Sequence, residues 1–408
     1  MIDPIVHLSY ASYRGRQTTP HTIAYLGIPY AESPAGPRRF RKPSPLDVDK
    51  ISSQIPNAVF DATHYPPSAM QGAVGEYSSL WQKRLRPYFH MDLTPTGKDC
   101  LKLDIYTPAQ ATPKDQWPVM VYIHGGGYVF GSPKNQPFDH WIDAHPNVVI
   151  VAVYYRLSIL GFLSHPEFQT SKVADNNAGL YDQLEALRWS AGGASVQLLL
   201  TAFSGRKQEL FHRAIVQSAY RTPIFSLNQK KAVFDEFMQY LHCPVQILDD
   251  QVEWLRSMNA AELIQAADMF AAKHDSVLWE WKPLVDGELI TDHFSRLVQI
   301  GRFVDVPVLT GTTTHDGRLI AGGTSFRDAF MAEFPGVDER DVQEIAEFYT
   351  TRSLNSTDAV GDALNCSAGV FLAEHFTDTW LYRFNEPAGT GRLVEHSSDN
   401  YLLFNGVQ

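Results

Sequence analysis

The sequence predicts an α/β protein with a mostly parallel central sheet flanked by helices. From about residue 100 onward, short apolar segments alternate with helical ones, which is the pattern of parallel strands joined by covering helices. Two continuous apolar runs, Met120–Ile123 and Val148–Val153, are typical of central strands covered on both faces. The core is therefore expected to form around these two strands.

The other elements are predicted from the spacing of apolar residues. Leu101–Tyr106 alternates as a half-buried strand does, and Leu180, Leu184 and Leu187 recur at helical spacing within Gly179–Trp189. No repeat or interdomain linker is evident, so residues 1–408 are expected to form a single domain. Further strands are expected at residues 214–217, 306–310 and 380–384, and helices at 194–202 and 228–275.

Composition excludes some classes of partner. Of the 408 residues, 44% are hydrophobic and 19% charged, and the net charge is −11, which argues against nucleic acid or an anionic membrane as a main partner. The sequence has no apolar run long enough to span a membrane and no signal-peptide pattern at its start. We expect a cytoplasmic protein, or a secreted one if an N-terminal leader is missing from this chain.

Three cysteines, Cys100, Cys243 and Cys366, lie far apart in the sequence and show no metal-ligand or redox spacing. An odd and sparse cysteine count is typical of a reducing compartment. The sequence therefore predicts neither disulfides nor a metal site.

A glycine-rich segment, His124–Gly127, directly follows the apolar run that ends at Ile123. Glycines after a strand expose backbone N–H groups, which can form an oxyanion hole for the negative charge that develops during acyl transfer. The alternative is a tight turn, because glycine adopts positive φ at little cost.

Three loops behind strands carry residues suited to acyl transfer: Ser190, Asp316 and His396. This chemistry needs a nucleophile, a base and an acid that orients the base, and open α/β sheets place such groups at the carboxyl ends of strands. Singly, each has a plain structural alternative, namely a helix cap for Ser190, turn chemistry for Asp316 and a packed or surface residue for His396. Their order along the chain, Ser, Asp, His, favours the catalytic interpretation.

Several longer motifs resemble those of the type-B carboxylesterases, the family that also holds the cholinesterases, and the chain looks most like the fungal members. The resemblance covers nearly all 408 residues. It implies an α/β-hydrolase fold. The motifs that carry it are Tyr25–Ala31 with Arg39, Phe40 and Pro43, then Asp99–Pro108, His124–Gly127, Tyr155–Leu163, Asn177–Gln183 and Pro283–Gly287.

The resemblance also implies a reaction, the hydrolysis of a small-molecule carboxylic ester through an acyl-enzyme, with no cofactor and no metal. Ser190 would be the nucleophile and His396 the base, and Asp316 stands where the family usually has Glu. The N–H groups of three residues would form the oxyanion hole: Gly126, Gly127 and Ala191.

The chain departs from the family pattern just before Ser190. In the family a buried strand leads into the sequence Gly-Glu-Ser-Ala-Gly, which contains the nucleophile. In this chain Arg188 and Trp189 directly precede Ser190. Compared with the family pattern, about 20 residues that include the strand are therefore absent. The family's serine lies in a nucleophile elbow, a sharp turn between a strand and a helix. Strand and helix come close together there, so the residue two before the serine is normally glycine, and the side chain of Arg188 at that position should clash. Two arrangements stay open, namely Ser190 between two helices, away from His396, or a sheet that lacks a central strand.

These departures leave several functions open. The chain also stops sooner after His396 than the family does, and Ala69 and Trp254 occupy the approximate positions of the partner cysteines of secreted relatives. A serine esterase, intact or impaired, is the leading interpretation. The alternatives are a catalytically silent binding protein of the same fold, acyl transfer to an alcohol or amine, and a truncated or mis-spliced gene product. Substrate and oligomeric state are not predicted.

Overall fold

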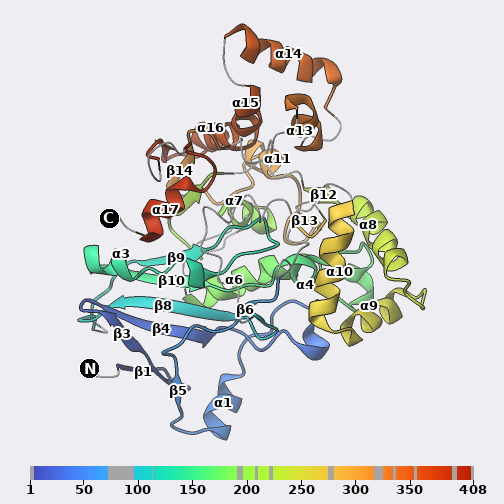
Figure 1. The fold of residues 1–408 in the computed structure, drawn as a ribbon. Coiled ribbons are helices and arrows are strands. Elements are labelled where there is room, and N and C mark those ends of the chain that lie inside the picture. Colours follow the sequence, from blue (N-terminus) through green and yellow to red (C-terminus); the bar gives the residue numbers. More distant parts are fainter. Residues whose placement is uncertain are drawn as a thin grey trace. The chain divides into compact units, whose positions relative to one another are not determined.

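The computed structural model describes residues 4–71, 96–112, 114–190, 196–206, 210–219, 224–273, 280–316, 325–333, 337–352, 356–387 and 393–405. The chain, drawn in Figure 1, divides into two compact units by its internal contacts. Unit 1 takes its described residues from 4–190 and 225–289, and unit 2 takes its described residues from 196–224 and 290–405. The single domain expected from the sequence stays a prediction.

A five-stranded sheet forms the centre of unit 1, in the order β3-β4-β8-β10-β9. Strands β3, β4, β8 and β10 pair antiparallel in succession, and β10 pairs parallel with β9. The strands predicted near residues 101, 120 and 148 are confirmed. Their bounds are β3 (Arg16–Thr19), β4 (Thr22–Pro29), β8 (Lys102–Pro108), β9 (Val119–Ile123) and β10 (Val149–Val153).

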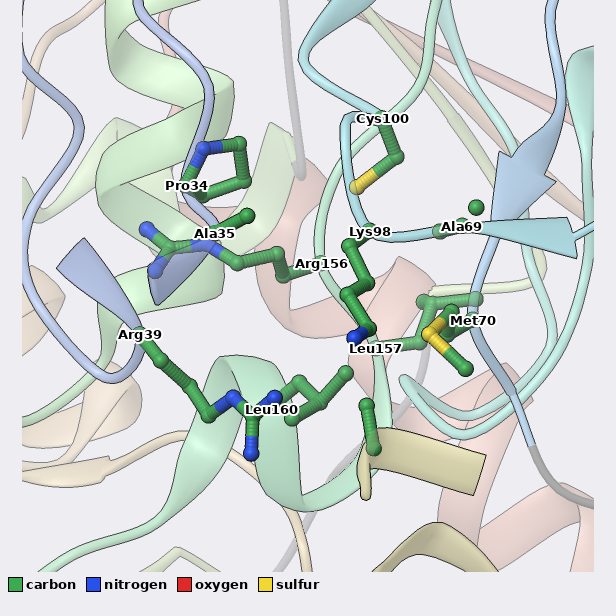
Figure 2. A pocket seen from close by; sticks show the side chains of 12 residues that line it. Pro34, Ala35, Arg39, Ala69, Met70, Lys98, Cys100, Arg156, Leu157 and Leu160 are labelled. Carbon is green, nitrogen blue, oxygen red and sulfur yellow. The ribbon is translucent and has the colours of Figure 1, made fainter. Parts of the chain in front are cut away.

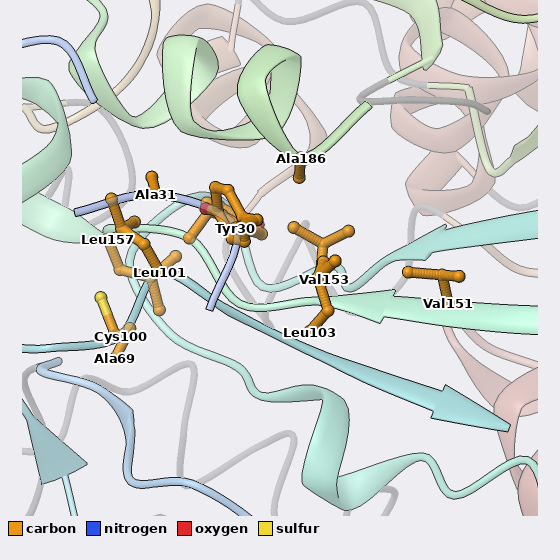
Figure 3. Close-up of a cluster of buried hydrophobic side chains, with 11 residues drawn as sticks. Tyr30, Ala31, Ala69, Cys100, Leu101, Leu103, Val151, Val153, Leu157 and Ala186 are labelled. Atoms are coloured by element: carbon orange, nitrogen blue, oxygen red, sulfur yellow. The ribbon is translucent and has the colours of Figure 1, made fainter. Parts of the chain in front are cut away.

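Both faces of strand β10 are covered, as the sequence predicted. On one face Val151 and Val153 join a buried cluster that includes Ala186 of helix α6 (Ala178–Ser190), seen in Figure 3. On the other face the neighbouring Tyr106 ring packs edge-on against Phe138, which begins helix α3 (Asp139–Ala144). Unit 1 therefore has helices on both sides of its sheet.

Strand β9 differs from the prediction. It is the last strand of its sheet within the described residues, its first residue Val119 is exposed and the other four are only half-buried. The expectation of a central strand covered on both faces was wrong for Met120–Ile123. The cause is its position, because an edge strand has a neighbour on one side only.

Unit 2 contains a three-stranded parallel sheet in the order β11-β14-β15. Helix α16 (Ser367–His375) packs on it. On the opposite face Ile215, Leu309 and Trp380 lie side by side across the three strands and are exposed. The strands are β11 (Ala214–Gln217), β14 (Val308–Thr313) and β15 (Thr379–Phe384), which confirms the three predicted later strands.

Of the remaining elements, helices α7, α8, α9 and α10 lie where the sequence predicted helices, at residues 194–202 and 228–275, whereas the others were not predicted. In unit 1 they are β1 (Ile5–His7), β2 (Ser12–Arg14), α1 (Val48–Gln54), β5 (Val59–Asp61), β6 (Ser68–Ala69), β7 (Thr96–Gly97), α4 (Ser158–Phe162), α5 (Phe168–Ser171), β12 (Phe225–Ser226), α8 (Leu227–Tyr240), α9 (Leu248–Ser257), α10 (Ala260–Lys273) and β13 (Leu284–Val285), with short turns of helix at Gly36–Arg38 and Pro133–Asn135. In unit 2 they are α7 (Val196–Leu200), α11 (Phe294–Gln299), α13 (Phe326–Glu333), α14 (Glu339–Thr351), α15 (Ser356–Gly361) and α17 (Ser398–Asn405), with further turns of helix at Ala202–Gly205 and Asp362–Cys366. Within the described ranges, no helix combines the length and the apolar character that crossing a bilayer requires.

Helix α6 is held in unit 1 by a buried ion pair. The Arg156 guanidinium, just after β10, donates Nη2 to Asp182 Oδ1 at 2.6 Å and Nε to Asp182 Oδ2 at 2.8 Å. The Arg156 backbone N–H also donates to Asp182 Oδ2. Both side chains are almost fully buried, at 4% and 0% exposure. Bidentate geometry of this kind is the strong form of the Arg–carboxylate pair.

We expect Asp182→Asn to lower the free energy of unfolding by about 3 kcal/mol or more, because it leaves the buried Arg156 charge without its counterion. Urea denaturation followed by circular dichroism measures the loss. Arg188→Gln is the control, since Arg188 pairs with Glu185 at 3.1 Å on the exposed side of the same helix and should cost below about 1 kcal/mol. Equal losses in the two variants would contradict this role of the buried pair.

Candidate active site

The glycine-rich loop after β9 adopts a backbone that only glycine fits. Gly126 has φ of 122° and Gly127 has φ of 61°. A Cβ atom on Gly126 would lie 2.0 Å from the Phe130 carbonyl oxygen, and the Gly126 carbonyl accepts the N–H groups of Val129 and Phe130. The loop is therefore a specific folded structure and more than a flexible turn.

Side chains from two other segments hold this loop. Gln71 donates to the Gly131 carbonyl at 2.9 Å and accepts the Gly131 N–H at 2.7 Å. The Tyr155 ring stacks on His124, and its hydroxyl donates to the His124 carbonyl at 2.9 Å. Burial lowers the pKa of His124 to about 4. His124 is therefore neutral near pH 7 and supports the loop as a packed residue.

The N–H groups of Gly126 and Gly127 make no hydrogen bond within the described part of the chain. Both glycines are half-buried. Two unused donors at the end of a strand are what an oxyanion hole requires, so the geometry favours this interpretation over a plain turn. The third predicted donor, Ala191, lies outside the described residues.

We expect Gly126→Ala to destabilise the protein by at least about 2 kcal/mol, because the new Cβ meets backbone at a positive φ. Thermal and urea unfolding measure the change. Gly125→Ala is the matched control, because Gly125 is exposed and a Cβ there meets nothing within 4 Å. A Gly126→Ala protein as stable as the control would contradict the geometry described for this loop.

In unit 2 the structure brings two predicted residues together. His396 Nδ1 donates to Asp316 Oδ1 at 2.6 Å. Asp316 follows strand β14, and the neighbouring His315 N–H donates to the Val394 carbonyl at 2.8 Å, with a single parallel bridge between His315 and Glu395. This short pairing explains why residues 80 positions apart in the sequence meet.

The two partners differ in exposure. The Asp316 side chain is 1% exposed, and its Oδ2 accepts the Thr313 N–H at 3.3 Å. The His396 side chain is 33% exposed. A buried carboxylate on Nδ1 fixes the imidazole so that Nε2 carries the lone pair, the orientation in which a histidine serves as a general base.

A second carboxylate, Asp399, lies near this pair. Burial lowers the pKa of His396, but the charge and hydrogen bond of Asp316 and the charge of Asp399 outweigh it, so the net pKa is raised. Burial raises the pKa of Asp399, which accepts a hydrogen bond from Gln217 at 3.3 Å. Sequence reasoning gave Asp399 and Gln217 no role. The one available signal was the position of Asp399, three residues after His396.

We expect Asp316→Asn to lower the pKa of His396, because the largest effect that raises it is removed while burial continues to act. In the parent protein the His396 pKa should lie above 6.5. The pair therefore stabilises the fold fully below pH 6.5, and this contribution is lost as the pH rises through the folded-state pKa. Histidine ring resonances followed by NMR over pH 5–9 test this. An unchanged His396 titration in the variant would contradict it.

Ser190 is the last residue of helix α6, and the next described helix, α7, begins at Val196. The backbone that precedes Ser190 is helical, as the leucine spacing predicted, and Arg188 lies exposed on it. No strand lies between β10 and β11 among the residues that the structure describes. Ser190 belongs to unit 1 and the Asp316–His396 pair to unit 2, so a triad of the three stays a prediction.

The described residues hold no cluster of His, Cys, Asp or Glu that fits a metal ion. Cys100, Cys243 and Cys366 form no disulfide.

Comparison with known proteins identifies the class. A profile described as the carboxylesterase family matches residues 2–189 and 190–365. Two solved structures superpose on 99% of the chain with a TM-score of 0.78: EstA of Aspergillus niger, at 25% identity over 82% of its chain, and a thermophilic PNB esterase, at 26% identity over 84%. The chain has the α/β-hydrolase fold, and it belongs to the carboxylesterase family.

Relatives of this chain carry different names. It is 31% identical to the acetylcholinesterase of Electrophorus electricus over 75% of this chain and 50% of that protein. It is 28% identical to neuroligin-3 of Mus musculus over 78% of this chain and 43% of that protein. It is also 28% identical to the para-nitrobenzyl esterase of Bacillus subtilis, over 94% of this chain and 79% of that protein. The chain thus spans about half the length of the first of these relatives.

Proposed function

We propose that the chain is a serine hydrolase that cleaves small carboxylic esters through an acyl-enzyme. The observation that carries the proposal is the 2.6 Å hydrogen bond from His396 Nδ1 to the buried Asp316 carboxylate. Membership of the carboxylesterase family and the similarity to a para-nitrobenzyl esterase support the ester substrate.

In the proposed reaction His396 Nε2 accepts the proton of the Ser190 hydroxyl, and Oγ attacks the ester carbonyl carbon. The N–H groups of Gly126, Gly127 and Ala191 would stabilise the negative oxygen of the tetrahedral intermediate. The intermediate collapses, the C–O bond to the alcohol breaks, and His396 returns the proton to the leaving alkoxide. Water, deprotonated by His396, then attacks the acyl carbon, the bond from that carbon to Ser190 Oγ breaks, and His396 returns the proton to Oγ, which releases the carboxylic acid.

A second function is favoured by a different observation. Helix α6 includes Ser190 as its last residue, and the family match is interrupted between Trp189 and Ser190. A nucleophile elbow is a strand-to-helix turn, and a helical residue 190 departs from it. The alternative is therefore a catalytically silent protein of the same fold, or an esterase that the missing segment has impaired.

Labelling with a fluorophosphonate probe separates the two functions, because the probe reacts only with an activated serine. For the hydrolase we expect a single adduct at Ser190, mapped by mass spectrometry, which Ser190→Ala abolishes and His396→Ala reduces at least about 100-fold. Ser53→Ala, at an exposed serine of α1, is the control and should label like the parent. Absence of any adduct in protein that circular dichroism shows to be folded would establish the silent alternative.

A further inference from the structure

A pocket in unit 1, apart from the candidate active-site residues, is lined by an excess of positive charge (Figure 2). The pocket is partly open to solvent. Three of its side chains are cationic, and none of the described residues that line it is acidic. The cations are Arg39, Lys98 and Arg156.

Arg39 is a buried cation without a carboxylate partner in the described part of the chain. It is 7% exposed, and its Nη1 donates to the carbonyls of Leu255 at 3.1 Å and Met258 at 2.9 Å. Burial, and then the nearby charge of Arg256, lower its pKa. Arg256 itself is engaged by Glu253. Buried guanidinium groups are normally paired with an anionic group. We therefore expect Arg39 to attract an anion.

Arg156 adds a hydrogen-bond donor that the protein does not use. Its Nε and Nη2 are taken by Asp182, but its buried Nη1 has no hydrogen-bond partner within the described chain. An unsatisfied buried donor is unusual in a folded protein. Asp182 neutralises the charge of Arg156, so the open Nη1 position contributes a directed donor rather than a surplus charge.

Lys98 completes the pocket from the side of the loop before β8. It is exposed and forms no ion pair with any described residue, whereas the adjacent Asp99 pairs with Lys102 at 2.9 Å. In Figure 2 the Arg39 and Lys98 side chains extend toward the middle of the pocket from opposite sides. Two uncompensated cations therefore face one space.

We infer that this pocket binds a compact oxyanion, phosphate or sulfate, through Arg39, Lys98 and the Nη1 group of Arg156. Guanidinium groups match the oxygens of such anions in number and direction. The anion would neutralise Arg39 and give Arg156 Nη1 an acceptor. This site does not depend on the proposed esterase activity, because it contains none of the residues assigned to that reaction.

Inorganic phosphate is the probe, added to the purified full chain and compared with sodium chloride at equal ionic strength. We expect phosphate, but not chloride, to raise the melting temperature, with heat of binding in calorimetry, and sulfate to compete with it. Lys98→Glu should weaken phosphate binding at least about 10-fold, since it replaces an attraction by a repulsion. Because Lys98 is exposed, this change leaves the fold intact.

Lys50→Glu is the matched control, because Lys50 is an exposed lysine of α1 in the same unit and changes the net charge equally. It should bind phosphate like the parent. Absence of phosphate binding, or equal weakening in Lys98→Glu and Lys50→Glu, would overturn the site and leave only a general attraction of anions. The fluorophosphonate result is independent of either outcome.

Discussion

The buried ion pair between Arg156 and Asp182 is the interaction on which unit 1 depends most, because it joins the end of strand β10 to helix α6. That helix supplies Ala186 to the core on one face of the sheet and ends at Ser190. The same arginine lines the cationic pocket, and its buried Nη1 has no hydrogen-bond partner within the described chain. This one salt bridge therefore contributes to the packing of α6, to the position of the candidate nucleophile Ser190 and to the proposed anion site.

Strands β9 and β11 are both end strands of their sheets within the described residues. Between β10 and β11 the described residues form helices and no strand, and the family match is interrupted between residues 189 and 190. Helix α6 also carries Gln183, fully buried with neither side-chain polar atom hydrogen-bonded in the described chain. Each such group costs about 1–3 kcal/mol. The absence of the strand that precedes the serine stays a prediction, and these features support it.

The sequence predicted most elements correctly because their patterns are local. The leucine spacing of α6 and the apolar runs of β9 and β10 depend only on neighbouring residues. The prediction for β9 was wrong about its cover on both faces. An apolar run indicates a buried strand, but whether other elements cover both of its faces depends on residues that are distant in the sequence. Loop position identified Asp316 and His396, whereas Asp399 was missed because its proximity to His396 depends on the turn into α17.

The two halves of the candidate site are stabilised independently. His396 and Asp316 are held by strand β14 and by the bridge between His315 and Glu395, all within unit 2. The glycine loop is held by Gln71 and Tyr155, all within unit 1. Neither set of contacts involves Ser190, so both halves persist whatever backbone residue 190 adopts. An intact His–Asp pair and an intact loop therefore do not by themselves test the proposed catalysis, and the reactivity of Ser190 is the property that tests it.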